Sequence, residues 1–206
     1  MAESEITVAA VILAGGASTR MGRPKASAPF LGEPLAARIL RRLGPQVARV
    51  YLNAREDDAE LAQLGAPLAP DSARWRGAGP LAGVAAGLVR AQADGFAYLA
   101  TSPCDAPFLP RDLVARLLAP VRAGAVAAVA VSDFGLEPMF ALWPVGALAT
   151  VEEALAAGRA SPRSVLTRLG AGQVAFAGDV FANLNTREDF ARAEARARAD
   201  LLSRIS

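Results

Sequence analysis

The first 130 residues alternate apolar runs with amphipathic stretches, and this alternation restricts the possible folds more than any other feature of the chain. Apolar runs typical of buried strands lie at 6–13, 47–52, 66–69, 96–100 and 125–131. Stretches with helical spacing lie between them at 34–43, 57–64, 80–92 and 110–118. Strands that alternate with helices form βαβ units, so we expect a three-layer α/β fold with a mostly parallel central sheet.

The last third of the chain is less regular. Strands are predicted at 138–143 and 173–177, and helices at 145–157, 162–169 and 186–202. Thr186 is a plausible N-cap of the final helix, because acidic residues occupy the turn that follows it. Neither a linker nor an internal repeat interrupts the pattern, so we predict a single domain over residues 1–206.

The chain has no histidine and only one cysteine, Cys104. An internal disulfide, a zinc site built on several cysteines and catalysis by a Ser-His-Asp or Cys-His arrangement are therefore excluded. Any chemistry has to use carboxylates, Lys, Arg, backbone amides or a hard metal ion. Those groups suit phosphoryl or nucleotidyl transfer, where positioning and charge neutralisation account for most of the catalysis.

Charge and hydropathy argue against nucleic acids and membranes as binding partners. The formal net charge is only +2, and no basic block is interleaved with aromatic residues, so no nucleic-acid partner is expected. No apolar run reaches the roughly 18 residues that would span a bilayer. The first residues, MAESEITVAA, carry acids where a signal peptide carries Lys or Arg, so we expect a cytoplasmic protein without a membrane partner.

The loop after the first predicted strand is the strongest functional signal. Glycines at Gly15 and Gly16 permit close backbone approach, and amides in such a loop can cradle phosphates. Arg20 and Lys25 can then neutralise a triphosphate, and Lys25 is the only lysine among 22 basic residues. The loop matches neither the Walker A nor the G-x-G-x-x-G pattern. An ordinary turn, with Arg20 paired to a surface carboxylate, is the alternative.

The string L-A-G-G-x-S-x-R-M-G-x-x-K at 13–25, followed by FLGEPL at 30–35, resembles the MobA-like nucleotidyltransferases. Further matching segments are GPLAG at 79–83, PCDAPFLP at 103–110 and NLNTRED at 183–189. Within the family, the chain is most similar to the guanylyltransferases of the molybdenum cofactor. The resemblance covers nearly the whole chain and implies a Rossmann-like nucleotidyltransferase fold.

The resemblance also implies roles for individual residues. Those implied to bind the nucleotide, GTP, are Leu13, Ala14, Gly15, Gly16, Arg20, Lys25, Asn53, Asp71, Gly79 and Asp105. Lys25, Asp105 and Arg20 are the implied catalytic residues, and Asp105 is the implied ligand of a Mg²⁺ cofactor. Asn183 and Asn185 are assigned to the acceptor.

Simpler interpretations stay open for several of these residues. Asp105 would cap the following helix, Asp71 would be a turn residue, and Asn53 would bond to loop backbone. The glycines at 79–83 would either admit a base or ribose or let a helix pack closely on the sheet. Cys104 is expected to be a small buried filler.

The implied reaction joins GMP from GTP to the terminal phosphate of molybdopterin and releases pyrophosphate, with the acceptor expected somewhere in 132–161 by elimination. A cytidylyltransferase that uses CTP for the same cofactor is the nearest alternative, followed by other small-molecule nucleotidyltransferases of this fold. A non-catalytic nucleotide-binding adaptor for molybdoenzyme maturation is the alternative from another class. The resemblance implies GTP and molybdopterin as substrates and molybdoenzyme-maturation proteins as further partners.

Overall fold

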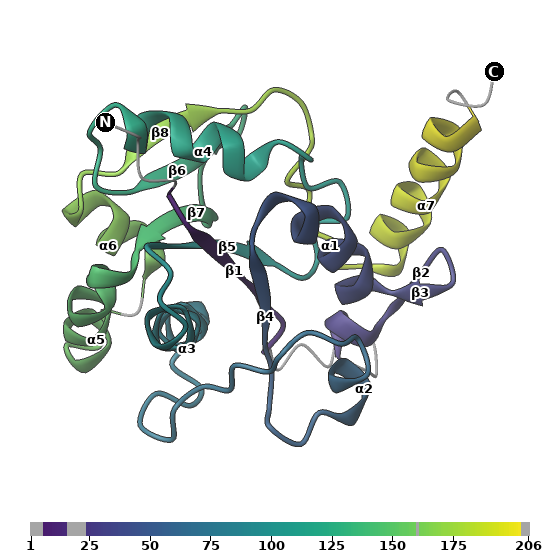
Figure 1. Ribbon diagram of the computed structural model, residues 1–206. Helices are drawn as coiled ribbons and strands as arrows, with labels where there is room; N and C mark the ends of the chain where they lie inside the picture. The colour runs from purple at the N-terminus through teal and green to yellow at the C-terminus, as the bar shows by residue number, and fades with distance from the viewer. Residues whose placement is uncertain (1–5, 16–23, 160, 203–206) are drawn as a thin grey trace.

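The computed structural model describes residues 6–15, 24–159 and 161–202. A six-stranded sheet with the order β4-β1-β5-β7-β6-β8 crosses the molecule (Figure 1). Its strands are β1 (Val8–Leu13), β4 (Arg49–Asn53), β5 (Tyr98–Pro103), β6 (Ala128–Ser132), β7 (Gly135–Pro144) and β8 (Gly172–Ala175). Only β7 is antiparallel to its neighbours, β5 and β6, so the predicted mostly parallel sheet is confirmed.

Helices cover both faces of this sheet, as the βαβ pattern predicts. One face carries α1 (Leu35–Leu43), the short α2 (Ala59–Ala62) and α4 (Leu113–Arg122). The other face carries α3 (Pro80–Ala93), α5 (Leu148–Ala156) and α6 (Pro162–Arg168). Three 3-10 turns, η1 (Lys25–Ser27), η2 (Gly44–Gln46) and η3 (Val145–Ala147), join these elements.

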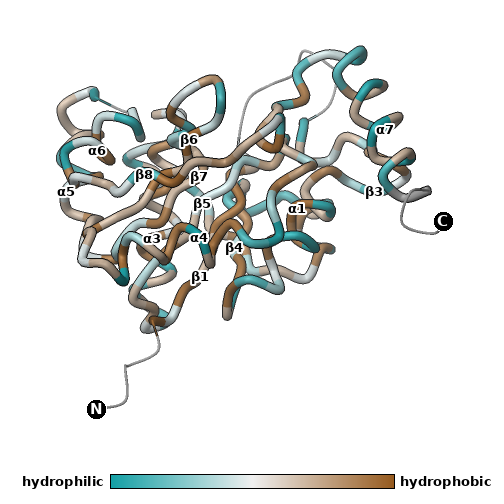
Figure 2. Tube along the Cα trace, turned by 90° about the horizontal axis from the view of Figure 1, so that it is seen from above, coloured by the Kyte–Doolittle hydropathy of each residue, from teal (hydrophilic) through white to brown (hydrophobic). Residues whose placement is uncertain are grey.

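Strand β1 lies between two hydrophobic clusters, and all six of its side chains are buried. Ala10 and Ile12 face the cluster under α1 and α4, whereas Ala9 and Val11 face the cluster under α3 and α5. A strand that is covered on both faces reads as a continuous apolar run, which explains why VAAVIL shows no alternation. Figure 2 shows such hydrophobic stretches along the central strands, and hydrophilic ones on α7 (Arg187–Leu202).

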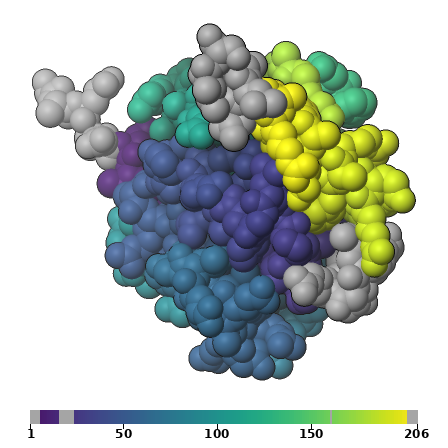
Figure 3. Space-filling model, turned by 90° about the vertical axis from the view of Figure 1, so that its right-hand side faces the viewer, coloured from purple at the N-terminus to yellow at the C-terminus, as the bar shows by residue number. Residues whose placement is uncertain are grey.

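A small hairpin and the C-terminal helix form a third cluster beside the sheet. Strands β2 (Pro29–Phe30) and β3 (Glu33–Pro34) were not predicted; each has only two residues. Leu31 and Gly32 join them with positive φ at both positions, as a tight hairpin turn requires. Helix α7 packs on this hairpin through Phe190, whose ring lies edge-on to Phe30 at 6.4 Å. Figure 3 shows α7 against this N-terminal region.

The strand predicted at 66–69 is not formed, and this prediction is wrong. Only Leu68 pairs with the sheet, as a single parallel bridge to Leu52. Pro67 and Pro70 flank the bridge and have no N–H to donate, so the ladder cannot extend. The other predicted elements occur with shifted ends, and α4 continues through Pro120 to Arg122.

Among the residues that the structure describes, none of the helices has both the length and the apolar character needed to cross a membrane.

Candidate active site

The carboxyl ends of three neighbouring strands, β1, β4 and β5, meet at one edge of the sheet. Leu13 at the end of β1 is in register with Asn53 on β4 and with Pro103 on β5. The backbone N–H of Ala14 donates to the Asn53 carbonyl at 3.0 Å, and that of Cys104 donates to the Leu13 carbonyl at 3.2 Å. In an open α/β sheet, ligands bind in the crevice beyond such strand ends.

Asn53 is buried at this edge and holds the segment between α2 and α3. Its amide nitrogen donates to the Ala69 carbonyl and to Oδ1 of Asp71, both at 2.9 Å. Asn53 therefore bonds to loop backbone, as the simpler interpretation of the sequence expected. It also holds the Asp71 carboxylate near the strand ends.

Glycines make room for the Asn53 side chain. A Cβ on Gly83 would lie 2.3 Å from Oδ1 of Asn53, and a Cβ on Gly15 would lie 3.2 Å from it. Gly83 therefore serves the close packing of α3 on the sheet. Gly79 is required for its backbone conformation: it stands at the N-cap of α3 with φ 81°, and a Cβ there would meet none of the described atoms within 4 Å.

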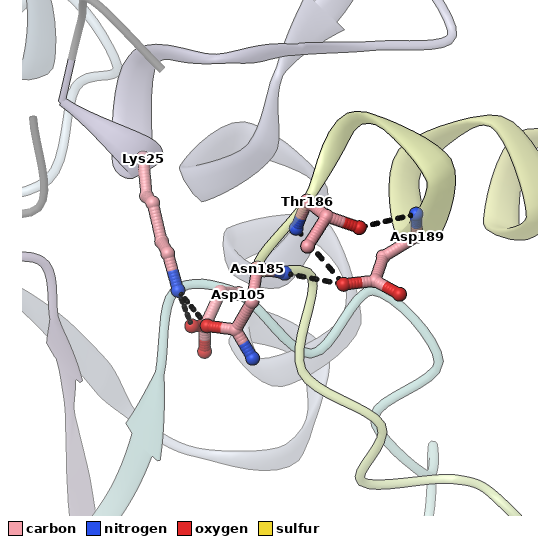
Figure 4. Close-up of polar contacts among 5 residues, drawn as sticks. All are labelled: Lys25, Asp105, Asn185, Thr186 and Asp189. Atoms are coloured by element: carbon pink, nitrogen blue, oxygen red, sulfur yellow. Dashed lines mark hydrogen bonds and ion pairs between the residues drawn. The ribbon is translucent and has the colours of Figure 1, made fainter. Parts of the chain in front are cut away.

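Lys25, Asp105 and Asn185 come together beside these strand ends, although they belong to distant segments (Figure 4). Nζ of Lys25, in η1, donates to Oδ2 of Asp105 at 2.9 Å and to Oδ1 of Asn185 at 2.6 Å. The Lys25 and Asp105 side chains are only 16% and 15% exposed, so solvent screens this ion pair little. Asn185, assigned from the sequence to the acceptor, contacts the lysine that was assigned to the triphosphate.

Asp105 is not a helix cap, contrary to the simpler interpretation of the sequence. It follows β5 directly, whereas α4 begins only at Leu113 after Asp112. The Asp105 carbonyl accepts the N–H of Leu184 at 3.0 Å, which ties the segment before α7 to the end of β5. Among the described residues, the Asp105 carboxylate bonds to the ammonium of Lys25.

Asp189 is a residue of this site to which the sequence analysis assigned no role in binding or catalysis. Its Oδ2 accepts the backbone N–H groups of Asn185 and Thr186 at 3.0 and 2.9 Å. Its own N–H donates to Oγ1 of Thr186 at 3.1 Å, which confirms Thr186 as the cap of α7. The spacing T-x-x-D at 186–189 is the signal that could have revealed this reciprocal capping arrangement.

Cys104 is buried next to Asp105, in surroundings that disfavour the thiolate form. Burial raises the pKa of the Cys104 thiol to about 12, and the neighbouring Asp105 charge adds to the effect. A thiol with such a pKa stays protonated near neutral pH, and only the thiolate reacts readily. The predicted role as a small buried filler agrees with this environment.

Among the described side chains, Asp105 fits a metal ion that is bound jointly by the protein and by substrate phosphates. They contain no cluster of three or more His, Cys, Asp or Glu that would enclose a metal by itself. Mg²⁺, however, commonly takes one or two carboxylates and completes its shell with water and substrate phosphates. Asp105, at a strand end and little exposed, fits that mode of binding.

Two of the predicted nucleotide-binding residues, Gly16 and Arg20, lie outside the residues that the structure describes. Leu13 and Asn53 end β1 and β4, Ala14 and Gly15 follow β1, Asp71 is bonded to Asn53, and Gly79 is the N-cap of α3. Asn183 is exposed on the segment that leads to Asn185. A hollow of about 290 Å³ lies elsewhere, between η2 and α4, and does not include Lys25 or Asp105.

Comparison with known proteins identifies the family to which this arrangement belongs. The family model described as the MobA-like NTP transferase domain matches residues 10–174. This chain belongs to the MobA-like NTP transferase family. The molybdenum cofactor guanylyltransferase of Rhodobacter capsulatus is 42% identical over 196 residues, which cover 93% of this chain and 97% of that relative. The chain is thus a nucleotidyltransferase, as the resemblance implied.

Solved structures agree on the fold of this MobA-like chain. The molybdopterin-guanine dinucleotide biosynthesis protein A of Archaeoglobus fulgidus superposes with a TM-score of 0.73 at 24% identity, covering 94% of this chain and all of that one. The 4-diphosphocytidyl-2C-methyl-D-erythritol synthase of Anaerococcus prevotii reaches 0.69 at 13% identity, covering 93% and 98%. The predicted Rossmann-like nucleotidyltransferase fold is therefore confirmed.

Proposed function

We propose that this protein transfers GMP from GTP to the terminal phosphate of molybdopterin, forming the guanine dinucleotide cofactor and releasing pyrophosphate. The observation that carries the proposal is the placement of Lys25 against Asp105 at the strand ends, in a chain 42% identical to a molybdenum cofactor guanylyltransferase. An ammonium and a carboxylate at this crevice are the charges that a metal-bound triphosphate requires.

In the proposed reaction, an oxygen of the acceptor phosphate attacks the α-phosphorus of GTP in line. The bond between the α-phosphorus and the oxygen that bridges to the β-phosphorus breaks, and pyrophosphate carries that oxygen away. The acceptor is a phosphate monoester and is already anionic near neutral pH, so no side chain has to remove a proton. This agrees with a chain that has no histidine.

The chain's own groups then act by charge and position. Lys25 would turn from Asp105 to the phosphates and neutralise their charge, with Arg20 assisting at the leaving pyrophosphate. Asp105 would hold Mg²⁺, which when bound offsets triphosphate charge and orients the phosphates. Asn53 would keep Asp71 directed into the crevice for the nucleotide.

We place the pterin end of the acceptor at the turn between β6 and β7, within the 132–161 region. Phe134 is 85% exposed at this turn and lines a small hollow together with Glu137 and the 178–182 segment. That segment leads directly to Asn183 and Asn185. A flat heterocycle can stack on an exposed ring, and a carboxylate such as Glu137 can accept its amino hydrogens.

The proposed enzyme is cytoplasmic, and its proposed partners are GTP, molybdopterin and molybdoenzyme-maturation proteins.

The assignment of Mg²⁺ to Asp105 is tested by measuring the turnover of Asp105→Asn as a function of Mg²⁺ concentration. The variant keeps the size of the side chain, so we expect the fold to persist while turnover falls by about 100-fold or more. Wild-type turnover and an unchanged Mg²⁺ requirement in Asp105→Asn would refute the assignment of the metal to Asp105.

A further inference from the structure

The first turn of α7 is connected to the Lys25–Asp105 ion pair through a chain of short contacts (Figure 4). Oδ2 of Asp189 accepts the backbone N–H of Asn185 at 3.0 Å, and Oδ1 of Asn185 accepts from Nζ of Lys25 at 2.6 Å. The ammonium of Lys25 in turn reaches Oδ2 of Asp105 at 2.9 Å. Asp189 is thus two contacts away from an ammonium that belongs to the N-terminal part of the chain.

An ordinary helix cap does not explain this arrangement fully. In a capping box, the acid at the third helical position accepts the backbone N–H of the N-cap residue, which is Thr186 here. Here one of the two amides belongs to Asn185, which precedes Thr186 and contacts Lys25 with its side chain. Fixing that amide also fixes the Asn185 backbone, and so it sets the point from which the side chain extends.

The Asn185 segment is held on its other side as well. The N–H of Leu184 donates to the Asp105 carbonyl at 3.0 Å, and the buried Leu184 side chain packs in the cluster with Phe190. Leu184 therefore anchors the segment to the end of β5, and Asp189 anchors it to α7. Between these anchors, Oδ1 of Asn185 lies 2.6 Å from Nζ of Lys25.

The chemistry of Asn185 suits a support that has to release or share the ammonium. A second carboxylate would hold Lys25 by charge and oppose its transfer to phosphates. A neutral amide oxygen gives one hydrogen bond, worth less than an ion pair, while keeping the ammonium near the crevice. The negative charge in this support lies one step back, on Asp189.

We propose that Asp189 is a positioning residue for nucleotidyl transfer: by holding the backbone of Asn185, it sets the place of the Lys25 ammonium against Asp105. The catalytic meaning of this inference rests on the proposed function, whereas its structural step does not. Backbone amides and Arg192 lower the pKa of Asp189 to about 2, so the carboxylate is charged throughout the range in which an enzyme is assayed.

The sole lysine allows a direct test. Growth with [¹⁵N]lysine labels one ammonium group in the chain, and its hydrogen exchange with water is measured by NMR in the absence of nucleotide. We expect a slow-exchanging signal in the wild type, at least about 10-fold faster exchange in Asp189→Ala, and partial recovery in Asp189→Asn, whose amide oxygen still accepts. Exchange as fast as that of free lysine in the wild type, or unchanged exchange in Asp189→Ala, would overturn the inference.

Two variants control for the stability of α7. Thr186→Ala removes the hydroxyl that caps the helix but leaves the Asp189–Asn185 contact, and Arg192→Ala removes only the ion pair with Oδ1 of Asp189, at 2.6 Å. Both should lower the melting temperature without speeding ammonium exchange. If Thr186→Ala speeds exchange as much as Asp189→Ala does, fraying of the helix explains the effect and the positioning role is wrong.

A double-mutant cycle tests the catalytic step. Asp189→Ala should raise the KM for GTP or lower kcat by about 10-fold in the wild-type background, and should add nothing in an Asn185→Ala background, since both act through one contact. Additive effects would contradict a path through Asn185. If no variant, nor the wild type, turns over GTP, the proposed function fails, while the exchange data still decide whether Asp189 positions Lys25.

Discussion

The ammonium nitrogen of Lys25 lies 2.9 Å from Oδ2 of Asp105, although 80 positions separate the two residues in the sequence. Both side chains are largely shielded from solvent; Asp105 follows the end of β5, and Lys25 reaches it from η1. In the absence of nucleotide the pair neutralises itself. In the proposed reaction the same two charges separate, the cation to the phosphates and the carboxylate to the metal.

Replacing Lys25 by Arg should abolish most turnover even though the charge is kept. A planar guanidinium cannot reproduce the compact contact of one nitrogen with both Asp105 and Asn185. We expect kcat/KM for GTP to fall by about 100-fold or more in steady-state assays. Arg168→Ala is a matched control, because it breaks an exposed pair with Glu153 at the same 2.9 Å and should leave turnover unchanged.

Cys104 should be dispensable for catalysis and inert to alkylation at pH 8. Its thiol pKa, raised from 9.0 to about 12 by burial, keeps the thiolate fraction negligible there. Cys104→Ala should retain at least half of the wild-type turnover. Between about pH 9 and 12 the thiol ionises in the unfolded chain but stays protonated in the folded one. The free energy of unfolding therefore falls as the pH rises through this range, and this fall should be smaller in Cys104→Ala. Rapid alkylation of the folded protein at pH 8 would contradict this description.

Gly83→Ala should disturb nucleotide binding through Asn53. The added methyl group would meet Oδ1 of Asn53 at 2.3 Å, so Asn53 has to move away from Ala69 and Asp71. Overpacking of this kind costs about 1–3 kcal/mol, measurable as a lower free energy of unfolding in urea. Gly146→Ala, at an exposed position of η3 where an added Cβ would have open space, should change neither stability nor nucleotide affinity appreciably.

Phe134→Ala should affect the acceptor and not the nucleotide. If the exposed ring supports the pterin, its removal should raise the KM for molybdopterin about 10-fold, since stacking on an aromatic ring contributes about 1–3 kcal/mol. The Kd for GTP, measured by calorimetry, should stay within a factor of two. Val126→Ala, another exposed apolar residue, serves as the control. An equal loss of GTP affinity in Phe134→Ala would argue against a separate acceptor surface.

Local patterns in the sequence were enough to predict the layers of the fold. Continuous apolar runs such as β1 and helical spacing such as α3 reflect burial of the segment itself. The hairpin of β2 and β3 escaped prediction because two-residue strands have no periodicity, and its stability comes from α7, far along the chain. The strand predicted at 66–69 is only a single bridge at Leu68, because the two flanking prolines limit pairing.

The site was predictable as a set of residues and not as a set of contacts. The residues at the strand ends follow from topology, since parallel strands bring their carboxyl ends to one edge. That Asn185 meets Lys25, and that Asp189 holds Asn185, depends on how α7 docks on the hairpin. That docking is decided by packing between Phe30, Phe190 and Leu184, which no local pattern reveals.

The most direct test of the proposed function is nucleotide selectivity, measured by calorimetric titration of the purified protein with GTP, CTP, ATP and UTP in the presence and absence of Mg²⁺. The account predicts Mg²⁺-dependent binding of GTP at least about 10-fold tighter than that of the other three, and loss of this binding in Lys25→Ala. Preferential binding of CTP would contradict the guanylyltransferase proposal, and binding of no triphosphate at all would contradict the assignment of Lys25 and Asp105 to a nucleotide site.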